Sequence, residues 1–74
     1  MKLVFKKELM LKRIEEEGRS DMVTSDVVEI LDNLDGQEVD KSCWDRVVYD
    51  KPVFWVVGKN GKGEYVNEND CEYV

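Results

Sequence analysis

The carboxylates and the two cysteines are the side chains of this sequence with the widest chemical range, but their setting does not favour catalysis. The chain has no histidine, so the usual general base at neutral pH is absent. A nucleophilic thiol needs a neighbour that lowers its pKa, and for Cys43 the sequence offers only carboxylates and Lys41. Paired carboxylates could cleave a sugar bond, but 74 residues leave little room for a sugar-binding cleft. We therefore expect that the chain is not an enzyme.

Three patterns could hold a metal ion or a phosphate group, and each lacks an essential part. Cys43 and Cys71 are far apart in the sequence, and a zinc site would need further ligands, for which only carboxylates are present. The acidic run before Gly36 resembles a calcium loop, but with Gly36 sixth the first ligand would be Leu31, which has no side-chain oxygen. The glycine run 58–63 is followed by a glutamate, where a phosphate loop has lysine and then serine or threonine. We expect neither a metal nor a cofactor.

Acidity is concentrated in the middle of the chain. The net charge is −6, and residues 20–50 alone carry nine acidic and two basic side chains, a net of −7. A surface of this sign repels nucleic-acid phosphates and anionic lipids, so we expect no direct binding to nucleic acid or membranes. It would attract a protein partner with a basic surface, although acidity also keeps a small protein dispersed in water.

Asp26, Glu29 and Asp32 lie on one side of a predicted helix. That helix has no lysine or arginine, so it would be repelled from the major groove of DNA. The same acids, continued by others between Glu38 and Asp50, could instead imitate a phosphate backbone and bind a basic groove on another protein. The alternative is a solvated helix face with no partner.

Aromatic side chains supply a second set of candidate binding residues. Phe54 and Trp55 belong to an apolar run and are expected in the core. Trp44 lies in a polar stretch, and could be a half-exposed anchor of the kind found at protein interfaces or a plug of the core. Tyr49 follows it a few residues later. The candidate protein-binding residues are therefore Trp44, Tyr49, Asp26, Glu29 and Asp32.

Two elements of helical period occupy about residues 6–35. Residues 6–17 contain good helix formers and an apolar stripe, and Gly18 follows at the position of a left-handed cap. A second helix is predicted to begin with Thr24 or Ser25 as its cap and to end at Gly36.

Strand patterns follow at about residues 37–74. The best predicted strand is 53–57, which is apolar on both faces and so needs cover on both. The remaining expected elements are short strands at 37–40, 45–49, 64–66 and 71–74, turns at 50–52 and 67–70, and a hairpin at 60–61. The prediction is a single α+β domain, residues 1–74. Two N-terminal helices would pack on the outer face, or across one end, of a small, strongly curled antiparallel sheet of three to five strands.

The second half of the chain resembles an SH3-like small barrel. The resemblance rests on residues 36–39, Trp44, the segment 52–57, the glycine hairpin, residues 64–66 and the turn before 70–74. In overall style the chain is similar to small acidic proteins of unknown function encoded by phages and prophages of Gram-positive bacteria. The resemblance implies a partial barrel and a role in binding and modulating a host protein. The peptide-binding segment of true SH3 domains is not recognisable, so proline-peptide recognition is not implied.

These patterns predict a small acidic, non-enzymatic protein-binding module. The alternatives are a DNA-mimic inhibitor that uses the acidic surface of residues 20–50, and a structural homo-oligomer. Two cysteines that suit a reducing compartment, although one disulfide is possible on count alone, and an N-terminal apolar run too short for a signal sequence lead us to expect a cytoplasmic location.

Overall fold

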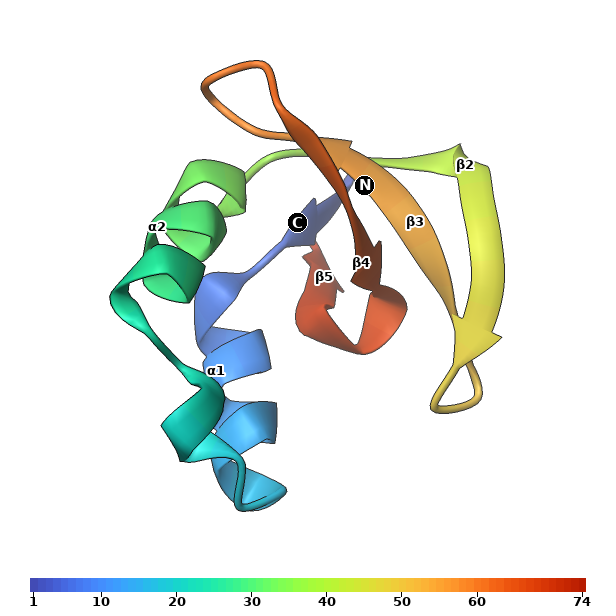
Figure 1. Cartoon of the computed structure of the whole chain (residues 1–74). Helices are drawn as coiled ribbons and strands as arrows, with labels where there is room; N and C mark the ends of the chain where they lie inside the picture. The colour runs from blue at the N-terminus through green and yellow to red at the C-terminus, as the bar shows by residue number, and fades with distance from the viewer.

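The computed structural model describes residues 1–74 as an α+β fold with two helices and five strands in two antiparallel sheets. The elements are β1 (Leu3–Phe5), α1 (Lys7–Glu16), the 3-10 turn η1 (Ser20–Met22), α2 (Ser25–Leu34), β2 (Val39–Val48), β3 (Lys51–Val57), β4 (Gly63–Asn67), the 3-10 turn η2 (Glu68–Asp70) and β5 (Cys71–Tyr73). Figure 1 shows both helices on one side of the strands and the two termini close together. The predicted α+β class is confirmed.

The helix ends follow from local sequence chemistry. Thr24 is the residue before α2, and its side-chain oxygen accepts a hydrogen bond of 3.3 Å from the backbone N–H of Val27. Gly18, just beyond α1, has a φ of 70°, and Gly36, just beyond α2, has a φ of 79°. Side chains other than glycine rarely adopt this left-handed backbone, so glycine stops both helices where the sequence predicted.

The strand β1 lies outside residues 37–74, where all the strands were expected. The sequence-based prediction missed this N-terminal strand. Its residues pair antiparallel with β5, Phe5 opposite Cys71. On its other side, the backbone N–H of Phe5 donates to the oxygen of Gln37, and Val4 forms a bridge with Glu38 at the entrance to β2. The helices are therefore inserted between the first and second strands, and β1 joins the two sheets.

The strands β2 and β3 differ from the expected pattern of two short strands and a turn at 50–52. Residues 39–48 form a single irregular strand, whose register with β3 shifts on both sides of Trp44. The turn lies at Tyr49 and Asp50, and Pro52 is part of β3 opposite Val47. Pro52 is tolerated there because the pairing of β3 with β4 begins only at Val53, so no partner needs a proline N–H.

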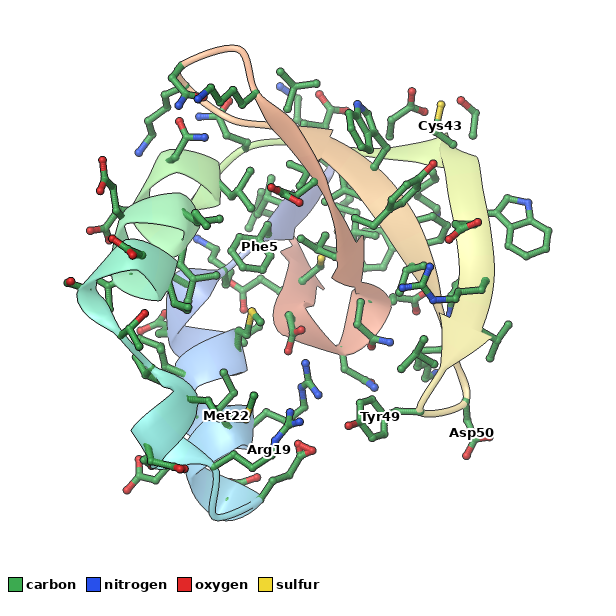
Figure 2. The ribbon with its side chains drawn as sticks, in the orientation of Figure 1. Phe5, Arg19, Met22, Cys43, Tyr49 and Asp50 are labelled. Atoms are coloured by element: carbon green, nitrogen blue, oxygen red, sulfur yellow. The ribbon has the colours of Figure 1, made fainter.

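A single apolar core lies between the helices and the inner faces of the strands. Phe54 and Val56 of β3 pack there with Leu31 and Leu34 of α2, and Figure 2 shows Phe5 in the centre of this region. Trp55 points to the opposite face of β3, where it is half-buried and meets Tyr65 edge to face at 5.0 Å. The expectation that Trp55 lies in the core is wrong. The helices pack on the face of β3 that carries Phe54 and Val56.

One ion pair ties α1 to η2. The guanidinium of Arg13 donates to both carboxylate oxygens of Asp70, at 2.9 and 2.7 Å. The Asp70 side chain is almost fully buried, and the backbone oxygen of Asp70 accepts from the N–H of Lys6. This hydrogen bonding raises the pKa of Arg13 further above its usual value. The pair fixes α1 against the chain that turns from β4 into β5.

Candidate functional site

The strand β2 is an edge strand that presents apolar side chains to solvent. It pairs with β3 on one side, and on the other side only the Val4–Glu38 bridge, at its entrance, links it to another strand. Every residue from Asp40 to Val47 is exposed. Trp44 is 60% exposed and Val47 is 63% exposed. A large aromatic and a large aliphatic side chain in solvent on one edge are typical of a surface that another molecule covers.

The turn after β2 adds a third exposed apolar side chain. Tyr49 is 56% exposed and has a φ of 54°, and Asp50 follows with a φ of 63°. Two-residue turns of this kind normally use Asn and Gly, because a tyrosine in the left-handed region is strained. The tyrosine ring lies against the guanidinium of Arg13, 5.2 Å from the ring centre. Figure 2 shows Tyr49 and Asp50 at this hairpin tip.

We use the name β2 surface for the three exposed side chains Trp44, Val47 and Tyr49, of which Tyr49 turns its ring towards Arg13 of α1. Sequence reasoning selected Trp44 and Tyr49, and the structure places both on β2 or its following turn. Sequence reasoning did not select Val47, because the strand pattern of the sequence does not show whether a valine points into the core or into solvent. The signal that identifies it is the irregular register of β2, which frees this end of the strand from the core.

The acidic candidates lie elsewhere. Asp26, Glu29 and Asp32 are exposed on α2, which Figure 1 shows on the side of the molecule away from β2. Asp32 forms an ion pair with Lys7, and this contact raises the pKa of the Lys7 ammonium group. The acids of α2 are therefore separated from those of β2, and one of the three is already neutralised by a lysine.

The hairpin after β3 also docks on α2. The side-chain oxygen of Asn33 accepts from the backbone N–H of Asn60 at 2.9 Å, and its backbone oxygen accepts from the N–H of Lys59. Lys59 also donates its ammonium group to the backbone oxygen of Asp32. Two lysines thus lie close to Asp32, and Asp26 and Glu29 are the acids of α2 without an ion pair in this structure.

Comparison with known proteins identifies no relative of this chain. No protein-family model, curated protein sequence or solved structure matches the chain. None of its helices has the length and apolar character needed to cross a lipid bilayer. The structure gathers no three His, Cys, Asp or Glu side chains in an arrangement that could hold a metal ion.

The two thiols differ in their environment, which gives a direct test of the fold. Cys43 is exposed on β2, as Figure 2 shows. Cys71 is partly buried, and burial raises its pKa to about 12. We expect a thiol reagent at pH 8 to label Cys43 within the mixing time and Cys71 only as fast as the chain unfolds, because the thiolate is the reactive form.

The measurement is the absorbance, with time, of the coloured group that the reagent releases when it reacts with a thiol. Cys43→Ser is the control and should remove the fast phase of labelling. In the unfolded chain the thiol of Cys71 has its ordinary pKa of 9.0, so adding denaturant should make both cysteines react quickly. Two fast phases in the native protein would contradict the burial of the Cys71 thiol.

Proposed function

We propose that this chain is a small acidic, non-enzymatic protein-binding module whose contact region is the β2 surface. The observation that carries the proposal is the exposure of Trp44 and Val47 on an edge strand. Interfaces concentrate their binding energy in a few central side chains, and tryptophan and tyrosine are the commonest of these. The strained backbone of Tyr49 adds support, because such strain persists where the surrounding structure or a function maintains it.

The architecture we propose is an SH3-like partial barrel with the helices inserted after its first strand. Support comes from the pairing of β1 with β5, from the bridge between Val4 and Glu38 that continues the sheet into β2, and from η2 between the last two strands. With the similarity in style to small acidic proteins of phages and prophages, this leads us to propose a modulator of a bacterial host protein as the biological setting.

Affinity capture with matched variants tests the binding proposal. Tagged protein would be incubated with a Gram-positive bacterial lysate beside Trp44→Ala and the double variant Asp26→Lys/Glu29→Lys, and retained proteins identified by mass spectrometry. We expect one stoichiometric protein that the wild type and the charge variant retain and Trp44→Ala loses. Loss of a central tryptophan costs about 2 kcal/mol or more, about thirtyfold in affinity. Urea unfolding should show that Trp44→Ala changes stability by less than about 0.5 kcal/mol.

The opposite pattern would select one of the alternative functions. Capture that fails with Asp26→Lys/Glu29→Lys, survives in Trp44→Ala and weakens at high salt would favour a basic partner that binds the acids of α2, as the partner of a DNA mimic would. A mass that rises with concentration, without any captured protein, would favour the homo-oligomer. In the first case the β2 surface is not the functional contact.

A further inference from the structure

A groove runs beside β4, and neither Trp44 nor Val47 is among its lining residues, although Arg13, on which the ring of Tyr49 lies, is one of them. It has a volume of about 330 Å³ and lies between β4 residues 64–67 and the two helices. Val27 and Ile30 of α2 and Met10 of α1 line its apolar wall. Its volume is at the lower end of that of ligand pockets, and the wall is mainly apolar, as such pockets usually are.

The edge of β4 that faces this groove is unpaired. β4 is the last strand of its sheet and pairs only with β3, through residues 63–67. In an antiparallel pair, alternate peptide groups point away from the partner strand. Among the backbone hydrogen bonds made outside the helices and strand pairs, none involves Gly63 or Tyr65. The peptide groups of these residues that point away from β3 therefore have no backbone partner. A segment that enters the groove in extended form would therefore find both hydrogen-bonding groups and an apolar wall.

The charge around the groove identifies the kind of occupant. Glu64 lines the groove and also an adjoining hollow, where it is joined by Asp26 and Glu29. Lys62 is the one basic residue that lines the hollow. Asp32 lines it too, but its charge is already paired with that of Lys7. The free charge at this rim is negative. A second copy of the chain would bring the same acids against one another, whereas a basic segment would meet complementary charge.

We propose that the groove binds an extended, lysine- or arginine-bearing segment of a partner protein, which adds as a strand to the edge of β4. Its backbone pairs with the unpaired peptide groups between Gly63 and Asn67. An apolar side chain of the segment packs between Val27 and Ile30, and its basic side chains lie beside Asp26, Glu29 and Glu64. Like the β2 surface, this groove would bind a protein, but the two sites are separate. Binding in the groove does not depend on Trp44.

Selection from a random peptide library tests the site without knowledge of the partner. Peptides of about ten residues, a length that covers most strands, would be displayed on yeast and selected with the whole chain. We expect enriched peptides that alternate apolar residues with lysine or arginine. Titrated into isotope-labelled protein, the best of them should shift the backbone amide signals of residues 63–67 and those of Val27 and Ile30. Methylating alternate backbone nitrogens of that peptide should weaken binding about tenfold, because it removes the hydrogen bonds of the added strand.

Matched variants separate this site from the β2 surface. Asp26→Lys/Glu29→Lys should weaken the selected peptide about tenfold at low salt, and Trp44→Ala should leave its affinity unchanged. The proposal is overturned if no peptide is enriched, if enriched peptides are not basic, if N-methylation has no effect, or if the shifts fall on residues 40–49. Because lysate capture that depends on Trp44 can succeed or fail independently of these results, the two proposals can be judged separately.

Discussion

Replacing Asp70 with alanine is expected to lower the free energy of unfolding by about 3–5 kcal/mol, because it leaves the guanidinium of Arg13 without its partner. Asp70 is 1% exposed and the Arg13 side chain is 21% exposed, so little water can replace the lost carboxylate. A second acid, Glu17, lies 3.6 Å from the same guanidinium but is not within hydrogen-bonding distance. Domains of this size are stable by roughly 4–11 kcal/mol, so Asp70→Ala should lose a large share of its stability and unfold at a clearly lower urea concentration.

Urea unfolding followed by tryptophan fluorescence measures this loss. The matched control is Asp45→Ala, which removes an ion pair with Arg46 in which both side chains are exposed, and should cost less than about 0.5 kcal/mol. The double variant Arg13→Met/Asp70→Leu removes both charges together and should recover most of the stability. Equal stabilities of Asp70→Ala and Asp45→Ala would show that the Arg13–Asp70 pair does not hold α1 to η2.

The elements that the sequence predicted correctly are those fixed by short-range chemistry. Gly18 and Gly36 end the helices because each supplies a left-handed residue, and Thr24 begins the second helix through its own hydroxyl. The hairpin at Asn60 and Gly61 forms for the same kind of reason, with Gly61 at a φ of 86°. In each case the information lies within a few residues of the feature it determines.

The features that the sequence did not predict depend on contacts between distant parts of the chain. β1 is three residues long and has no period of its own, and it is a strand only because β5 and residues 36–38 lie beside it. Trp55 leaves the core because the face of β3 opposite Phe54 has no helix over it. There its ring lies over Gly63, where an added Cβ would come within 2.1 Å of a ring carbon.

The candidate site was predictable only in part, for a similar reason. Residue type alone marked Trp44 and Tyr49 as candidates, but two readings of Trp44, anchor or core plug, were equally consistent with its polar neighbours. Its exposure follows from the shifts in register that separate the second half of β2 from the regular pairing with β3. The acids between Asp26 and Asp50 are one run in sequence, yet the fold places those of α2 and those of β2 on different sides.

Replacing Phe5 with alanine is expected to cost about 3–5 kcal/mol, since its side chain is fully buried and alanine would leave a cavity at the centre of the core. The backbone of this residue accepts a hydrogen bond of 2.8 Å from Gly36 and donates one of 3.1 Å to Gln37. The side chain therefore sits where β1, β5 and the end of α2 meet. Losing it weakens the strand that joins the two sheets as well as the packing against Leu34.

Thermal and urea unfolding of three variants separate this role from a general sensitivity to mutation. Phe5→Leu keeps most of the volume and should cost less than about 1.5 kcal/mol. Met22→Ala, at an exposed residue of η1, should change stability by less than about 0.5 kcal/mol. If Phe5 belonged instead to the exposed start of α1, Phe5→Ala would behave like Met22→Ala. A loss several times larger, with β5 amides next to Cys71 exchanging faster with solvent, is the result expected of a residue that unites the two sheets.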